Sequence, residues 1–214
     1  MTEIGLCERK KARTRRVIAE AAARLFAERG YERVAVSDVA REAEVSEQTV
    51  YNYFPTKEHL VTDYDQEVQD QLSRLIRTRA PGTTAAAAIR EFALDVVEGI
   101  RRVPGEQWRG ELGYLAAISP AVHRLALEMS DRQAAAIATA ISETGAVTPE
   151  MARLQGIALA GVSQIIISEA GRRTREGQSQ GRIADELRPA IEAIIDELDR
   201  WLSGQDAQPA SRGI

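Results

Sequence analysis

The sequence has almost none of the residues on which disulfides, metal sites and most catalytic centres depend. One cysteine, Cys7, and two histidines are present among 214 residues. A single cysteine cannot form an internal disulfide or anchor a zinc site by itself. No glycine loop has the spacing that cradles phosphate groups in nucleotide-binding proteins. The composition therefore argues against an enzyme, and we expect no metal and no cofactor.

Long apolar runs and strand patterns are also missing. No stretch of about 18 consecutive apolar residues occurs, so we expect no membrane span. The first residues lead into a basic segment and not into the apolar core of a secretory signal. No convincing run of alternating polar and apolar residues favours a β-strand. These absences predict an all-α protein of the cytoplasm.

Lysine is scarce and unevenly placed. The three lysines, Lys10, Lys11 and Lys57, all lie in the first 57 residues. The formal net charge of −4 argues weakly against a nucleic-acid partner, yet residues 9–16 carry six positive charges and no negative one. Phosphate contacts require local and not total positive charge. The basic run is therefore a candidate for nucleic-acid contact, with a solvated helix start as the alternative.

Helical periodicity runs through nearly the whole chain and predicts about nine helices. Gly30 is expected to end the first helix in a left-handed conformation, with Tyr31 folded back onto Phe26. Ser46 is a predicted N-cap, and Pro55 breaks the chain before a long fourth helix that begins at Lys57. Residues 171–181 are predicted to form a loop. The predicted helices span about 9–29, 36–43, 46–54, 57–80, 89–100, 108–118, 120–144, 149–170 and 183–202.

These helices predict two domains. A three-helix domain spans residues 9–60 and a larger helical domain spans residues 61–203, with tails at 1–8 and 204–214. We expect the connection to run along the fourth helix near residue 60 and not through a flexible linker.

Two apolar stretches in the larger domain predict self-association. The segment 157–167 is apolar almost all round, so we expect it to be buried on most sides. The last helix carries an apolar stripe from Ile183 to Leu202. The two stretches predict a homodimer that pairs through the last two helices as a four-helix bundle, with Trp201 at the dimer seam.

The two short helices at 36–43 and 46–54 have the helix-turn-helix layout, in which the second helix enters the major groove of DNA. If Val50 points inward, Phe54 and Ser46 lie within about 40° of the same direction at about 100° per residue. Gln48 and Asn52 then point outward. Gln and Asn side chains can each form two hydrogen bonds to adenine. A face that is merely polar and solvated is the alternative.

The residues that surround this pair of helices resemble the TetR family. The resemblance covers about residues 9–61 and is carried by the segments 24–31, 36–40 and 45–60. It includes the block Thr49-x-Tyr51-x-Tyr53-Phe54-x-x-Lys57-Glu58. It implies a transcription regulator, most commonly a repressor, that binds a near-palindromic operator in double-stranded DNA as a homodimer and is released by a small-molecule effector. The residues implied to face DNA are Gln48, Tyr51, Asn52, Tyr53 and Lys57, with Thr49 close by.

The sequence departs from the family pattern at two positions. Ala35 replaces the threonine common before the second helix, which removes a cap and a phosphate contact that Ser37 is expected to replace in part. Glu44 replaces the glycine of the turn, where the backbone conformation favours a residue without a side chain. Lys57, at the start of the predicted fourth helix, is expected to strengthen a phosphate clamp.

The ligand pocket implied among the middle helices leaves little trace in the sequence. A binding site needs an apolar lining with a few polar groups, and Trp108 and His123 are the leading candidates. The candidate lining residues are Phe92, Trp108, Tyr114, His123, Met129 and Gln164. The competing hypothesis is a helical interaction or ligand-storage protein whose polar third helix is inert.

Overall fold

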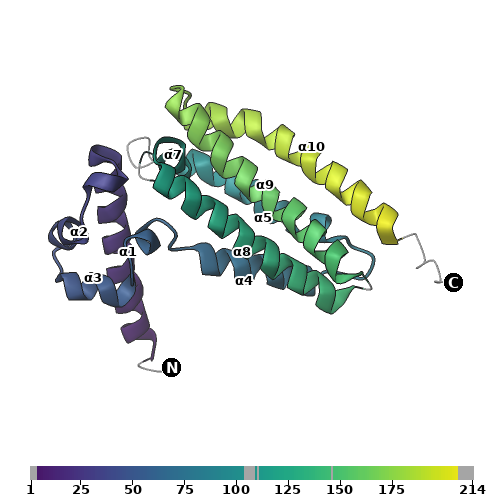
Figure 1. Cartoon of the computed structure of the whole chain (residues 1–214), viewed down its shortest axis with the longest axis horizontal. Helices are drawn as coiled ribbons and strands as arrows, with labels where there is room; N and C mark the ends of the chain where they lie inside the picture. Colours follow the sequence, from purple (N-terminus) through teal and green to yellow (C-terminus); the bar gives the residue numbers. More distant parts are fainter. Residues whose placement is uncertain (1–3, 104–108, 110, 146, 207–214) are drawn as a thin grey trace. The chain divides into compact units, whose positions relative to one another are not determined.

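The computed structural model describes residues 4–103, 109, 111–145 and 147–206, and in these ranges it contains nine α-helices and two short 3-10 helices (Figure 1). No strand occurs in the described ranges, so the prediction of an all-α fold is confirmed. The helices are α1 (Ile4–Arg29), η1 (Tyr31–Arg33), α2 (Val36–Glu42), α3 (Glu47–Tyr53), η2 (Glu58–Leu60), α4 (Asp65–Arg77), α5 (Ala85–Arg102), α7 (Leu112–Ile118), α8 (Pro120–Thr144), α9 (Pro149–Arg175) and α10 (Gln180–Asp206).

The helices form two compact units. The N-terminal unit comprises the described residues of Met1–Asp63 and Val103–Ala126, and the C-terminal unit those of Tyr64–Arg102 and Leu127–Ile214. The N-terminal unit thus takes in α7 and the first residues of α8, which the predicted division at residue 60 assigns to the other domain. The functional meaning of that division stays a prediction.

One hydrophobic core holds the N-terminal unit together. The apolar stripe of α1, including Ile18 and Phe26, packs with Val50 of α3 and with Leu115 of α7, and all four side chains are almost completely buried. Gly30 has the predicted left-handed conformation, with a φ of 82°. The ring of Tyr31 lies 5.2 Å from that of Phe26, centroid to centroid, as predicted. Burial of this stripe is the main source of stability for these short helices, because isolated helices of this length are marginal in water.

The turn between α2 and α3 has the geometry expected from the sequence, and its backbone is locally strained. Ser46 caps α3, since its Oγ accepts a hydrogen bond of 3.0 Å from the backbone N–H of Thr49. Glu44 has a φ of 54°, in the left-handed region that a residue with a side chain rarely adopts. For such a residue this conformation costs roughly 1–2 kcal/mol.

The predicted continuous fourth helix is wrong at its start. The chain forms the 3-10 helix η2 and then a turn, and α4 begins only at Asp65. Two carboxylates explain the break. Asp63 accepts a hydrogen bond of 2.7 Å from Nε of Arg15, whereas Asp65 accepts one of 2.8 Å from Nε of Arg132 on α8. Hydropathy periodicity carries no information about these tertiary contacts.

The helices of the C-terminal unit lie side by side in Figure 1. Helix α5 packs against α4, α9 and α10. A side chain in place of Gly156 on α9 would put its Cβ 2.4 Å from the carbonyl oxygen of Ala134 on α8, so glycine permits the close approach of these two helices. By length and composition alone α9 could cross a bilayer, but one of its faces is buried against other helices of the unit.

The predicted loop at 171–181 is also wrong for most of its length. Helix α9 continues to Arg175 and α10 begins at Gln180. Arg172 pairs with Glu169 and Glu176, three and four residues away on the same helix, and Arg173 pairs with Glu186 of α10. Pairs at this spacing stabilise a helix, which explains why an arginine-rich segment with Gly171 remains helical.

We expect Glu44→Gly to raise the free energy of unfolding by about 1 kcal/mol, because glycine removes the steric cost of the left-handed turn. Urea unfolding of the full chain followed by circular dichroism measures the change. The matched control is Glu42→Gly, which removes the same charge from the last residue of α2 and should destabilise the protein. A loss of stability in Glu44→Gly would contradict the assignment of strain to this turn.

Candidate DNA-binding site

Helix α3 has one buried face and one polar, exposed face. Val50 and Phe54 are 0% and 1% exposed and fix the helix on the core. Gln48 and Asn52 are exposed on the opposite side, and Tyr51 is 44% exposed. Nε2 of Gln48 donates a hydrogen bond of 3.1 Å to Oδ1 of Asn52, so the two amide side chains are linked along the outer face of the helix. The structure thus has the inward and outward directions expected from the helical wheel.

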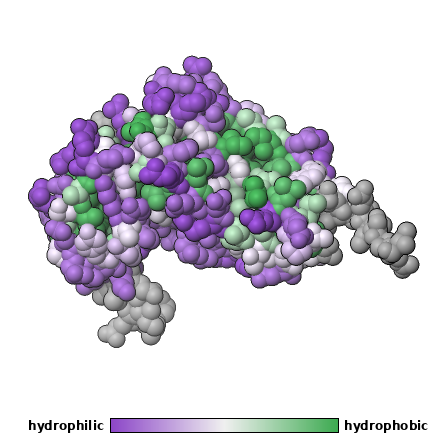
Figure 2. All heavy atoms as spheres, in the orientation of Figure 1, coloured by the Kyte–Doolittle hydropathy of each residue, from purple (hydrophilic) through white to green (hydrophobic). Residues whose placement is uncertain are grey.

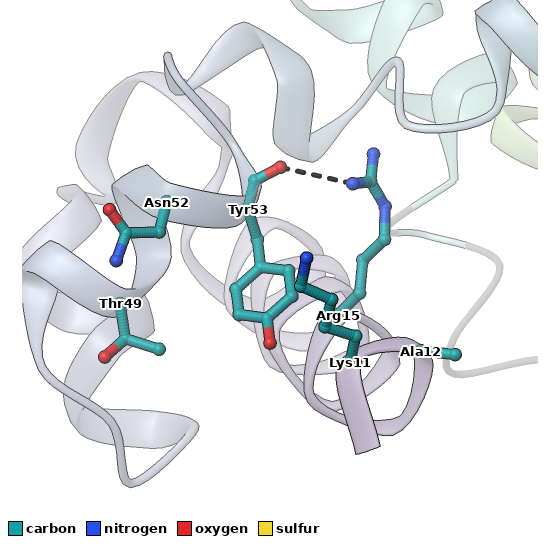
Figure 3. A pocket seen from close by; sticks show the side chains of 6 residues that line it. All are labelled: Lys11, Ala12, Arg15, Thr49, Asn52 and Tyr53. Atoms are coloured by element: carbon teal, nitrogen blue, oxygen red, sulfur yellow. Dashed lines mark hydrogen bonds between the residues drawn. The ribbon is translucent and has the colours of Figure 1, made fainter. Parts of the chain in front are cut away.

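The flank of α3 that turns toward α1 borders an open groove of about 710 Å³ (Figure 3). Thr49 and Tyr53 are both half-buried on this flank. The groove therefore continues the polar face of α3 onto the basic half of α1. Its lining residues are Lys11, Ala12, Arg15, Thr49, Asn52 and Tyr53.

Arg15 ties the end of α3 to α1 and to the chain beyond η2. Its guanidinium forms an ion pair with Asp63 and donates a hydrogen bond of 3.3 Å to the backbone oxygen of Tyr53. It also lies over the ring of Phe54, 4.8 Å from the centroid. The carboxylate of Asp63 is buried and Arg15 is half-buried, so this pair is shielded from solvent more than a surface ion pair would be. Arg15 thereby fixes the backbone from which the Tyr53 side chain projects.

Lys57 does not occupy the position that the sequence predicts. It precedes the three-residue helix η2 and not the first turn of a long helix, so a clamp assisted by the α4 N-terminus is wrong. Its ammonium lies over the ring of Tyr31, 4.2 Å from the centroid. Burial lowers the pKa of Lys57, and the carboxylates of Glu32 and Glu58 oppose that shift. Lys57 is half-buried, and its ammonium group lies at the edge of the site.

At the start of α2 an aspartate satisfies one backbone donor, although not the donor that a threonine cap would satisfy. Ala35 offers no side-chain cap, but Oδ2 of Asp38 accepts a hydrogen bond of 3.0 Å from the backbone N–H of Ala35. Ser37 is half-buried in the first turn of the same helix. Its predicted phosphate contact is untested by the geometry and stays a prediction.

Residues 18–64 match the family described as bacterial regulatory proteins, tetR family. The match supports a TetR-family transcription regulator and covers less than a quarter of the chain. A curated relative, the uncharacterized HTH-type transcriptional regulator YuxN of Bacillus subtilis, is 30% identical over 86 residues, which are 40% of this chain and 30% of that protein. The chain thus spans less than a third of the length of the curated relative that it matches.

Solved structures share the fold of this chain. Native NalD of Pseudomonas aeruginosa, described as the secondary repressor of the MexAB-OprM multidrug efflux pump, has a TM-score of 0.54 at 18% identity, over 86% of this chain and 97% of that one. A second NalD structure has a TM-score of 0.53 at 16% identity, over 90% and 96% of the two chains. At these identities the similarity shows the fold alone.

The predicted ligand-pocket residues are divided between the two units, and the pocket stays a prediction. Tyr114 and His123 belong to the N-terminal unit, and His123 is exposed. Phe92, Met129 and Gln164 belong to the C-terminal unit, where Phe92 packs against the core and Met129 is buried. Trp108 lies outside the described residues. A second open groove, of about 500 Å³ between α4 and α8, is lined by none of these residues.

Sequence reasoning missed two residues that line the α1–α3 groove, Lys11 and Arg15. Both lie in the basic run at 9–16, and their spacing of four residues places them on the same side of α1. This spacing within the basic run is the sequence feature that could have identified the two residues. The partners of Arg15, Asp63 and the Tyr53 carbonyl, follow only from the folded structure.

We expect Tyr31 to titrate near pH 12. Its burial, followed by the charge of the Glu58 carboxylate, raises the pKa of its phenol to about 12. Because the folded-state pKa lies above the usual value of about 10, the resulting stability is complete below pH 10 and is lost as the pH rises toward 12. Ultraviolet titration of phenolate absorbance measures this step. It should vanish in Tyr31→Phe, and ionisation of Tyr31 near pH 10 in the folded protein would contradict the assignment.

Proposed function

We propose that this protein is a transcriptional regulator that binds an operator in double-stranded DNA, acts as a homodimer and represses its target until a small-molecule effector releases it. The observation that carries the proposal is the polar face of α3, exposed at Gln48, Tyr51 and Asn52 while Val50 and Phe54 hold the helix on the core. Amide and phenol groups on a short helix of a helix-turn-helix suit base edges and phosphates in the major groove. The match of residues 18–64 to the tetR family supports the same function.

We expect Gln48→Ala and Tyr51→Ala each to weaken operator binding by roughly 5- to 150-fold, since one good base contact contributes about 1–3 kcal/mol of discrimination. Fluorescence anisotropy with a fragment selected from genomic DNA measures the affinity, and thermal unfolding verifies that the variants fold. Gln66→Ala is the matched control, because Gln66 is an exposed amide on α4 outside the proposed site. Unchanged affinity in both α3 variants would refute the assigned face and favour an inert polar helix.

The surface proposed for dimerisation lies on α9. Side chains of Leu154, Ile157 and Ile165 are 49%, 54% and 38% exposed, so the predicted burial of the segment 157–167 on most sides is wrong for a single chain. These residues line one face of the helix, opposite the face buried within the unit. Figure 2 shows apolar side chains gathered over the helices of the C-terminal unit. An exposed apolar face of this kind marks an interaction site.

Helix α10 lies partly in the core of its own chain. It packs chiefly against α5, and five side chains of its apolar stripe are buried, namely Ile183, Leu187, Ile191, Ile195 and Leu202, whereas Ile194, Leu198 and Trp201 are only half-buried. The proposed dimer uses the exposed face of α9 together with α10, and the pairing of these last two helices stays a prediction.

We expect Ile157→Asp to convert the dimer into a monomer at micromolar concentration, because it places a charge in the proposed apolar interface. Light scattering coupled to size exclusion measures the mass. Leu127→Asp is the matched control, since Leu127 is also an apolar side chain, 45% exposed, but lies on α8 outside the proposed interface. A wild-type monomer, or an Ile157→Asp variant that stays dimeric, would remove this interface from the proposal.

Repression and release by an effector are the finer part of the proposal. The description of NalD as a repressor supports repression as the mode of action for a chain with this fold. A dimer places two α3 helices in successive major grooves about 34–36 Å apart. An effector that binds the C-terminal unit would shift the population toward conformers that no longer match this spacing. DNA as partner also favours the cytoplasm, as predicted, over any role for α9 in a membrane.

A further inference from the structure

The groove between α1 and α3 is positively charged and contains several hydrogen-bond donors. Its two charged lining residues, Lys11 and Arg15, are both positive, and no carboxylate lines it. Oδ1 of Asn52 already accepts the hydrogen bond from Gln48, so Asn52 turns its amide nitrogen to other partners. The Tyr53 side chain stands between the two walls (Figure 3). This chemistry fits an anion.

The two cationic side chains that line the groove differ in how many contacts they already make. Arg15 is engaged on three sides, by Asp63, by the Tyr53 carbonyl and by the ring of Phe54. Lys11 is exposed and has no ion-pair partner among the residues whose side chains the structure describes, whereas Arg16 and Arg24 on the same helix pair with Glu20 and Glu42. Lys11 can therefore reach an incoming anion without first breaking a contact with any of these residues. Arg15 instead fixes the wall against which that anion would lie.

We propose that this groove seats one backbone phosphate of the bound DNA, with Lys11 as the contacting cation and Arg15 as the residue that positions Tyr53. The inference rests on the proposed DNA-binding function and adds a contact from α1 to it. Asn52 and Thr49 belong both to the groove and to the face of α3 that meets base edges, so a strand read by α3 passes directly beside Lys11. Phosphate contacts of this kind fix the register of a recognition helix without reading sequence.

The test compares Lys11→Gln with Lys10→Gln in the full chain. Both variants lose one positive charge from α1, but Lys10 lies about 100° further round the helix and does not line the groove. Operator affinity is measured by anisotropy over a salt series. Each neutralised phosphate contributes about 0.9 to the slope of log affinity against log salt, and the dimer has one such phosphate in each half-site, so Lys11→Gln should flatten the slope by about 1.8. Lys10→Gln should leave it nearly unchanged.

A second arm locates the phosphate. In operator duplexes with single methylphosphonate substitutions, one position per half-site should weaken wild-type binding several-fold and have no further effect on Lys11→Gln. The loss of affinity caused by Lys11→Gln should be the same on operator and on unrelated DNA, since the contact is to the backbone. Equal salt slopes for the two lysine variants would overturn the proposed phosphate site in the groove but not the proposed DNA-binding function. The same conclusion would follow if no methylphosphonate position affected wild-type binding more than binding of Lys11→Gln. A wild-type protein that binds no DNA would overturn both proposals together.

Discussion

Burial of Val50 and Phe54 against the apolar stripe of α1 is the constraint on which the rest of the site depends. A helix of seven residues has little stability of its own, so the orientation of α3 comes from these two anchors and from the Ser46 cap. Once they are buried, helical geometry leaves no freedom in the placement of Gln48 and Asn52, which must project outward. The same packing that stabilises the N-terminal unit thus determines which side chains can reach a partner.

A second level of organisation is electrostatic. Asp63 and Asp65 are two residues apart, yet the first is held by Arg15 of α1 and the second by Arg132 and Gln133 of α8. The chain between η2 and α4 is thereby anchored at both ends by buried carboxylates. These contacts take the place of the continuous helix expected from the sequence.

The parts of the fold that sequence reasoning predicted are those set by local chemistry. Gly30, Ser46 and the strained Glu44 each mark a boundary whose backbone conformation depends on the residue itself. Periodicity likewise gave the buried face of α3. The failures differ in origin: the break before Asp65 depends on tertiary contacts of Arg15 and Arg132, whereas the helical course of residues 171–175 depends on ion pairs of Arg172 with its own helix and of Arg173 with α10. A pattern of apolar residues shows that a face is buried but cannot distinguish its own chain from a second copy.

Candidate ligand residues were the least predictable, because an aromatic or polar side chain in a helical sequence has the same signature in a core as in a cavity. His123, exposed, and Met129, buried, illustrate the two ordinary outcomes. The residues of the α3 face are more predictable because polarity at positions 48, 51 and 52 contrasts with full burial at 50 and 54.

Repeated selection of randomised duplex DNA by the purified full-length protein tests the central claim most directly. The account predicts enrichment of a two-fold symmetric motif whose half-sites are centred about 10–10.5 base pairs apart, or a multiple of that distance. Failure to enrich any motif, with equal retention of all sequences across the salt series, would contradict it.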